Sequence, residues 1–207
     1  MTTRDNRLRA ENLNNRGLDR ALELLSIRLK QNGAKPVEIV VCGGSALILT
    51  GLVPRVTKDV DVLALSKDGH LLSPDPLPES IVRAAKEVAE DLGLIHNWLN
   101  NGPSRGEGGL FQMGLPEGCE ERLLSRAFGD HLTVHFIDRY DQVYFKLYAA
   151  VDRGGYHVED LLALSPDLDE IEAAARWAMT HDVSEGFALI LKEMLRSLGY
   201  ETVANRL

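Results

Sequence analysis

The stretch from residue 37 to residue 65 decides the fold, and it reads VEIVVCGGSALILTGLVPRVTKDVDVLAL. Residues 37–42 are β-branched and apolar over the length of a short buried strand. Gly43-Gly44 then interrupts the apolar run, and residues 45–50 predict a short helix. A second strand is predicted over residues 59–65, where charged and apolar residues alternate at the start. The stretch therefore predicts a strand, a tight turn, a helix and a second strand in close succession.

The rest of the chain adds one more clear strand and a series of helices. The strand is expected over residues 132–137, and residues 66–79 and 97–109 are expected as loops because turn-forming residues dominate them. Helical periodicity covers six further segments, which are residues 18–31, 81–92, 142–151, 158–164, 168–179 and 185–198. The first two-thirds of the chain is thus mixed and the last third helical, which predicts the α+β class.

Length and composition are those of a globular protein. A chain of 207 residues with 44% hydrophobic and 26% charged residues can bury a sizeable core. We expect an α/β core over residues 1–138, with residues 1–15 flexible, and a helical subdomain over residues 139–207. No apolar run approaches the roughly 20 residues that cross a bilayer, and the polar start lacks a signal-like apolar segment. These features predict a cytoplasmic location and no membrane partner.

Charge and cysteine usage narrow the classes of function. The net charge of −8 disfavours a protein whose main task is to hold a nucleic-acid backbone, because such proteins present basic surfaces. Any contact with nucleic acid would have to be local. Cys42 and Cys119 have no neighbouring cysteine at the spacing of a zinc or redox motif, so neither a metal knuckle nor a structural disulfide is expected.

The Gly43-Gly44-Ser45 turn has the features of a phosphate site. A strand followed by this turn and a helix presents backbone N–H groups and a hydroxyl at a helix N-terminus, where the helix dipole favours anions. The two glycines allow a ligand to approach the backbone closely. On its own, however, a Gly-Gly pair after a strand is most often only a tight turn.

Asp59 and Asp61 form a carboxylate pair. Alternate residues of a strand point to the same face, so both carboxylates project together while Val60 turns to the core. Two like charges this close are unfavourable unless a cation lies between them. A magnesium ion held by one or two carboxylates and by substrate phosphates would explain the pair. A solvated strand edge is the plainer interpretation of an isolated Asp-x-Asp.

Two blocks of sequence carry a resemblance to a known superfamily. The first is VCGGSAL at residues 41–47 with RVTKDVDV at residues 55–62, and the second is KLYAA at residues 146–150 with Asp152-Arg153 and Glu159-Asp160-Leu161. They resemble the nucleotidyltransferase superfamily, in the branch of the abortive-infection AbiEii and MenT-type toxins and of an uncharacterised bacterial family of nucleotidyltransferase-like proteins. The resemblance implies a nucleotidyltransferase-like mixed sheet flanked by helices, with a helical C-terminal region.

The resemblance also implies a reaction. The superfamily's chemistry is the transfer of a nucleoside monophosphate from an NTP, with Mg²⁺ or Mn²⁺, to a macromolecular acceptor. Here the acceptor would be RNA, such as a tRNA end, or a protein. The setting would be a toxin–antitoxin system in which an antitoxin or another protein is the partner.

The same resemblance assigns tasks to individual residues. The implied nucleotide-binding residues are Gly43, Gly44, Ser45, Arg55 and Lys146. The implied catalytic residues are Asp59, Asp61, Lys146 and Asp160. Asp59 and Asp61 would hold the metal, and Ser45 would bind the β- and γ-phosphates. Lys146 would contact the triphosphate, Asp160 would orient Lys146 or the substrate, and Arg55 would contact phosphate or pair with an acid.

At one position the chain departs from the superfamily. His135 stands on the strand where active members usually supply a third carboxylate. Three interpretations compete: His135 is itself a base or metal ligand, Asp138 reaches in, or the site is degenerate. A degenerate site would bind a nucleotide or a protein partner without turnover, and we favour activity slightly over this alternative. An unrelated α/β protein with an accidental Asp pair is the weakest hypothesis.

Plainer interpretations also exist for several other side chains. Lys146 lies on an apolar helix face and could extend its ammonium group to solvent. Arg153 and Asp160 could form an ordinary surface ion pair of little energetic weight. His131 and His157 have no partner at metal-binding spacing, so both are expected at the surface.

Overall fold

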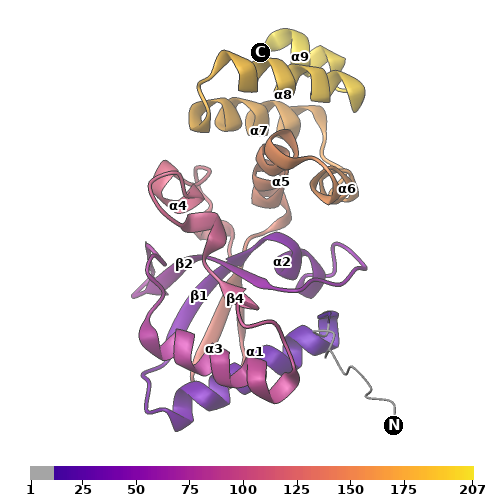
Figure 1. Cartoon of the computed structure of the whole chain (residues 1–207). Coiled ribbons are helices and arrows are strands. Elements are labelled where there is room, and N and C mark those ends of the chain that lie inside the picture. Colours follow the sequence, from indigo (N-terminus) through magenta and orange to yellow (C-terminus); the bar gives the residue numbers. More distant parts are fainter. Residues whose placement is uncertain (1–11) are drawn as a thin grey trace, which may run out of the picture.

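A mixed sheet of six strands lies at the centre of the fold in the computed structural model, which describes residues 12–207 (Figure 1). The strands are β1 (Val37–Cys42), β2 (Val60–Lys67), β3 (His70–Leu72), β4 (Leu99–Asn100), β5 (Leu124–Ala127) and β6 (Leu132–Phe136). Their order is β3-β2-β1-β6-β5, and β4 pairs in parallel with β2 outside this order. β1 runs antiparallel to β2 and parallel to β6. The predicted α+β class is confirmed.

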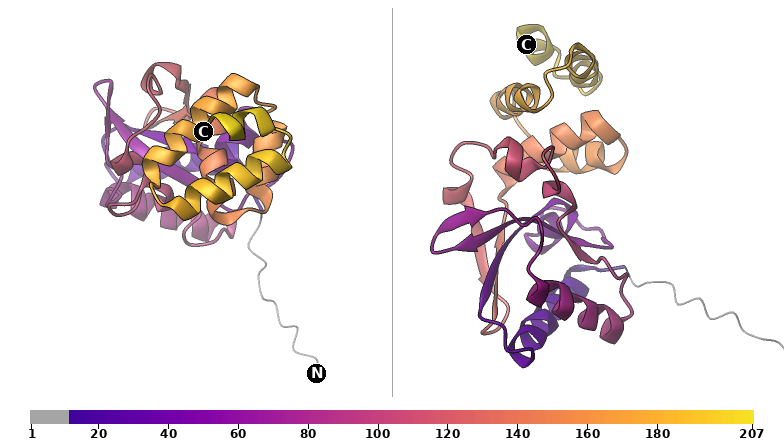
Figure 2. Two further views of the ribbon diagram at one scale, coloured as in Figure 1. Left: turned by 90° about the horizontal axis from the view of Figure 1, so that it is seen from above. Right: turned by 60° about the vertical axis from the view of Figure 1, so that its left-hand side comes forward.

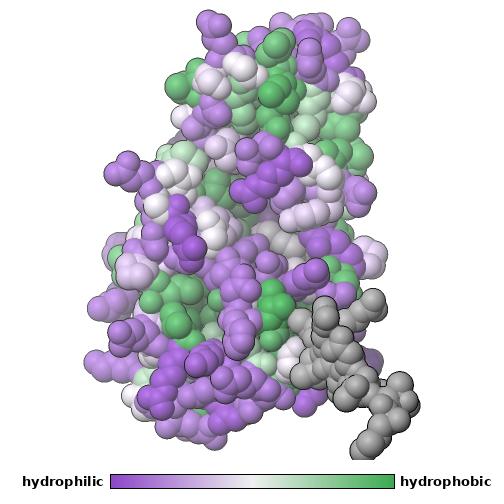
Figure 3. Space-filling view, in the orientation of Figure 1, coloured by the Kyte–Doolittle hydropathy of each residue, from purple (hydrophilic) through white to green (hydrophobic). Residues whose placement is uncertain are grey.

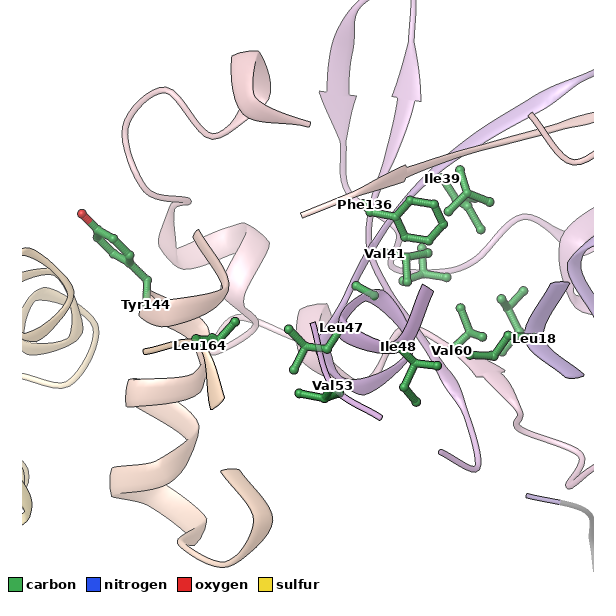
Figure 4. Close-up of a cluster of buried hydrophobic side chains, with 14 of the residues drawn as sticks. Leu18, Ile39, Val41, Leu47, Ile48, Val53, Val60, Phe136, Tyr144 and Leu164 are labelled. Carbon is green, nitrogen blue, oxygen red and sulfur yellow. The ribbon is translucent and has the colours of Figure 1, made fainter. Parts of the chain in front are cut away.

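Two amphipathic helices, α1 (Asn15–Gln31) and α3 (Glu79–Leu92), cover one face of the sheet. Alternate strand residues point to the same face, and those on this face form the core with the two helices. In Figure 4, Leu18 of α1 lies near Val60 of the sheet. The sheet residues of this core include Ile39, Val41, Val60, Val62, Leu132, Val134 and Phe136. Each fully buried side chain of this kind contributes roughly 1.5–3 kcal/mol.

The short helix α2 (Gly43–Leu49) connects the sheet to the helical part of the molecule. It follows β1 without a loop, because Cys42 ends the strand and caps the helix. In Figure 4, Leu47 lies between Val41 of the sheet and Leu164 of the C-terminal region. The hydrophobic core is therefore continuous from the sheet into the C-terminal helices.

Five helices make up the C-terminal third, and they are α5 (Arg139–Arg153), α6 (Tyr156–Ala163), α7 (Leu168–His181), α8 (Glu185–Ser197) and α9 (Glu201–Arg206). The side chains of Asp138, Asp167 and Ser184 cap α5, α7 and α8 by accepting hydrogen bonds from backbone N–H groups. Figure 2 shows α7, α8 and α9 stacked on the far side of α5 and α6 from the sheet. Within the described residues, all strands precede residue 139.

The structure changes some of the predicted boundaries. The predicted loops at residues 66–79 and 97–109 contain the short strands β3 and β4, which are too brief to give an alternating pattern. The predicted flexible segment lies mostly outside the described residues. Its last part is ordered, because Leu13 forms two backbone hydrogen bonds with Thr57 at 2.7 and 2.9 Å.

The surface is largely polar on the face shown in Figure 3, with apolar side chains more frequent toward the C-terminal helices. Val183, Leu189 and Ile190 are exposed in this part of the chain. None of the helices within residues 12–207 combines the length and apolar character needed to cross a membrane.

Candidate functional site

A cavity of about 680 Å³ is lined by the sheet on one side and by the C-terminal helices on the other. The first wall consists of residues at the end of β1, in the first turn of α2 and in the segment Arg55 to Asp61. The second wall consists of side chains from α5 and α6, among them Lys146 and Arg153. Residues between Asn100 and Leu110 form a third wall. The cavity thus brings the two sequence blocks together.

Asp59 and Asp61 both line this cavity. Asp61 is the second residue of β2 and pairs in register with Cys42, whereas Asp59 lies just ahead of the strand. The Asn100 amide donates to Asp61 Oδ1 at 3.3 Å, and the Thr57 hydroxyl donates to Asp59 Oδ1 at 3.1 Å. The predicted projection of both carboxylates to one side is confirmed.

The two carboxylates repel each other in a partly enclosed site. Burial, and after it the nearby charge of Asp59, raises the pKa of Asp61 to about 6. Such a pair fits Mg²⁺ or Mn²⁺, because these ions take one or two protein carboxylates and complete their shell with water and phosphate oxygens. Within residues 12–207 there is no cluster of three or more His, Cys, Asp or Glu side chains that could hold a metal. Asp59 and Asp61 are the carboxylates that line the cavity.

Gly43 and Gly44 make room for two charged side chains. Gly43 has a φ of +70°, and a Cβ at this position would lie 2.9 Å from Asp61 Oδ2. A Cβ at Gly44 would lie 2.7 Å from Arg55 Nη2. The helix begins two residues earlier than predicted, because Gly43 and Gly44 belong to the first turn of α2. Their lack of side chains lets Asp61 and Arg55 approach the helix closely.

A buried carboxylate joins two of the predicted cations. Asp160 accepts two hydrogen bonds from Arg55, at 2.9 and 2.8 Å, and one from Lys146 Nζ at 2.7 Å. The side chains of Lys146 and Asp160 are only 4% and 3% exposed. The interpretation of Lys146 as a side chain extended to solvent is therefore wrong. So is a surface pair of Arg153 with Asp160, since Arg153 Nε contacts Asp152 instead.

Three predicted site residues do not line the cavity, and they are Asp160, Ser45 and His135. Ser45 is 1% exposed, and its hydroxyl lies 3.5 Å from the carbonyl oxygen of Cys42. His135 Nδ1 is 2.7 Å from the Ser125 hydroxyl, and its Nε2 is 2.9 Å from Glu38. The side chains of Ser45 and His135 thus contact groups other than the carboxylates of Asp59 and Asp61.

The strand register explains where a third carboxylate would have to stand. Val41 pairs with Phe136, so the next residue pair across β1 and the end of β6 is Cys42 with Ile137. Cys42 also pairs with Asp61 of β2 on its other side. Asp61, Cys42 and Ile137 therefore form one row across the sheet, and His135 lies outside this row. Asp138 caps α5 by accepting from the Asp141 N–H, so it does not reach in either.

The structure also assigns to the cavity some residues that the sequence did not single out. The predicted plain loop at residues 97–109 contributes Asn100 and Arg105, and α6 contributes Tyr156 and His157. The prediction of a surface position is wrong for His157, which is 9% exposed and whose buried Nδ1 has no hydrogen-bond partner. Glycine density was the only sequence signal for the loop, and no sequence signal placed Tyr156 or His157 in the site.

His157 gives the protein a testable dependence of stability on pH. Burial, and then the charges of Lys146 and Arg153, lowers its pKa to about 4. An unfolded histidine takes up its proton near pH 6.5, so the unfolded state binds more protons between pH 6.5 and 4. His157 therefore lowers the stability progressively as the pH falls through this range.

We expect His157→Gln to flatten the pH dependence of the free energy of unfolding between pH 6.5 and 4. Urea unfolding at several pH values would measure it, with His70→Gln on the exposed β3 as the matched control. Parallel curves for wild type and His157→Gln would contradict the prediction.

Comparisons of the chain with protein-family models, curated proteins and solved structures yield no match.

Proposed function

We propose that the protein is a nucleotidyltransferase-like enzyme that binds an NTP with Mg²⁺ or Mn²⁺ and transfers its nucleoside monophosphate to a hydroxyl of RNA or protein. The observation that carries the proposal is that Asp59, Asp61 and Lys146 line one cavity although they come from distant parts of the chain. This juxtaposition suits a metal-bound triphosphate, with carboxylates on one wall and an ammonium group on the other.

The charge of the cavity supports the same ligand class. Two acidic side chains line it, against five basic ones, which are Arg55, Lys58, Arg105, Lys146 and Arg153. Asp160, which pairs with Arg55 and Lys146, reduces this local excess of positive charge without removing it. The chain as a whole has a net charge of −8. Because a cleft with one sign of charge concentrates oppositely charged ligands, the cavity favours a small polyanion such as an NTP.

The proposed reaction gives each group a defined task. A bound metal would neutralise phosphate charge between the nucleotide and the carboxylates of Asp59 and Asp61. Lys146, fixed by Asp160, binds the outer phosphates and stabilises the charge that develops on the leaving group. The acceptor oxygen bonds to the α-phosphorus as the bond to the bridging oxygen breaks. Pyrophosphate leaves, and the hydroxyl proton passes to solvent.

Label transfer tests the proposal directly. The protein would be incubated with each α-labelled NTP, Mg²⁺ or Mn²⁺, and total cellular RNA or protein. We expect transfer that disappears in the Asp59→Ala/Asp61→Ala variant and persists in Asp169→Ala, which removes an exposed carboxylate of α7. The absence of both transfer and metal-dependent nucleotide binding in the wild type would refute the proposal.

A degenerate, nucleotide-binding or partner-binding scaffold is the second candidate. It is favoured by Ile137, an apolar residue that lies in the same row of the sheet as Asp61 and Cys42. The same assay separates the two candidates, because a degenerate nucleotide-binding site retains metal-dependent nucleotide binding but transfers no label. An antitoxin-type partner in a toxin–antitoxin pair would be compatible with either candidate.

A further inference from the structure

Asn100 connects the third wall of the cavity to Asp61. β4 runs parallel to β2 for two residue pairs, which are Val60 with Leu99 and Asp61 with Asn100. The pairing places the Asn100 side chain beside the carboxylate, where its Nδ2 donates to Asp61 Oδ1 at 3.3 Å. Asn100 also lines the cavity. β4 therefore brings an amide to the side of Asp61.

The orientation of this amide follows from its second contact. Asn100 Oδ1 accepts a hydrogen bond from the backbone N–H of Gly102 at 2.7 Å. A backbone N–H can only donate, so it requires the oxygen of the amide and turns the NH₂ group toward Asp61. Gly102 also leaves the space that this contact needs, because a Cβ there would lie 2.8 Å from Asn100 Oδ1.

The two oxygens of Asp61 thus have different surroundings. Oδ1 is held by Asn100, whereas Oδ2 lies against Gly43, where a Cβ would stand 2.9 Å away. Asp61 also lies near the like charge of Asp59, which by itself would turn the carboxylate away. A donor on Oδ1 opposes this rotation.

We propose that Asn100, locked by Gly102, is a positioning residue that holds Asp61 in the orientation in which its carboxylate binds a divalent cation. The inference rests on the proposed function for the identity of the cation. Groups that orient metal ligands by hydrogen bonds commonly change metal affinity by about 10–100-fold when they are removed. The same range is expected here.

Two variants disturb the contact in different ways. Asn100→Ala removes the amide, and Gly102→Ala keeps it but pushes its oxygen away. Gly102 does not have a positive φ, so alanine fits its backbone conformation. The matched control is Asn97→Ala, which removes an exposed amide from the same segment. Mn²⁺ titrations followed by electron paramagnetic resonance, with and without an NTP, would give the affinities.

We expect Mn²⁺ affinity to fall about tenfold or more in both Asn100→Ala and Gly102→Ala, and to stay at the wild-type value in Asn97→Ala. Thermal unfolding would establish that each variant is folded. Wild-type affinity in folded Asn100→Ala and Gly102→Ala would overturn the proposal.

A measurement without metal separates this inference from the proposed function. The side-chain amide resonances of Asn100, observed by NMR, are expected to shift in Asp61→Ala because their acceptor is lost. If the wild type bound neither Mn²⁺ nor NTP, the proposed function would fail, and these resonances would still decide the Asn100–Asp61 contact. Unchanged Asn100 resonances in Asp61→Ala would refute it.

Discussion

Replacing Asp160 by alanine is expected to lower the free energy of unfolding by about 3–5 kcal/mol, the usual effect of removing one partner of a buried ion pair. Asp160 accepts hydrogen bonds from both Arg55 and Lys146. Without it, the buried ammonium group of Lys146 would lose the carboxylate that accepts its hydrogen bond. Urea unfolding at pH 7 would measure the loss.

The pH dependence of the free energy of unfolding gives a second test of how Asp160 contributes to stability. Burial alone would raise the pKa of Asp160, but the hydrogen bonds from Arg55 and Lys146 outweigh burial and lower it. A carboxyl with a lowered pKa stabilises the fold fully above its unfolded pKa of about 3.9 and loses this contribution as the pH falls through its folded pKa. The Asp160→Ala variant should lack this part of the acid transition.

Asp152→Ala is the matched control for Asp160→Ala. Asp152 also pairs with an arginine, Arg153 at 3.0 Å, but both side chains are largely exposed. Exposed ion pairs contribute little, so this variant should unfold at nearly the wild-type urea concentration. Equal midpoints for the two variants would show that the buried carboxylate is not a stabilising centre.

The local elements of the fold could be predicted from the sequence because their signals are local. β1 occupies the predicted residues 37–42, since a β-branched run between a proline and two glycines allows little else. The helices of the C-terminal third were predicted to within a few residues for the same reason, apart from α9, which spans only six residues. The carboxylate pair was found because the period of a strand places alternate residues on one side.

Contacts between distant segments could not be predicted in the same way. Nothing local distinguishes Asp160 as the partner of Arg55, which lies 105 positions earlier. Whether His135 occupies the position of a third carboxylate depends on the register of β6 against β1. In the observed register, Ile137, two residues further along the chain, lies level with Asp61 across the sheet. Asn100 reaches Asp61 only through β4, a strand of two residues. These features are set by tertiary packing.

Replacing Asp61 by asparagine is expected to separate activity from stability. We expect label transfer to fall by about 10²–10³-fold, because a neutral amide cannot bind the cation or offset its charge. The free energy of unfolding should rise by roughly 1–3 kcal/mol, because burial and Asp59 both disfavour the ionised carboxylate that asparagine removes. The new side chain keeps an oxygen to accept from Asn100. Transfer assays and urea unfolding at pH 7 would measure the two effects.

Asp68→Asn is the control for Asp61→Asn, because Asp68 lies exposed in the turn after β2, with a φ of 52° that asparagine tolerates. Neither activity nor stability should change in this variant. A loss of stability in Asp61→Asn would mean that the charge of Asp61 is compensated within the protein. The carboxylate pair would then be a structural feature. A gain in stability together with a loss of transfer is what a site maintained for a cation predicts, because such a site keeps a repulsion that the fold alone does not need.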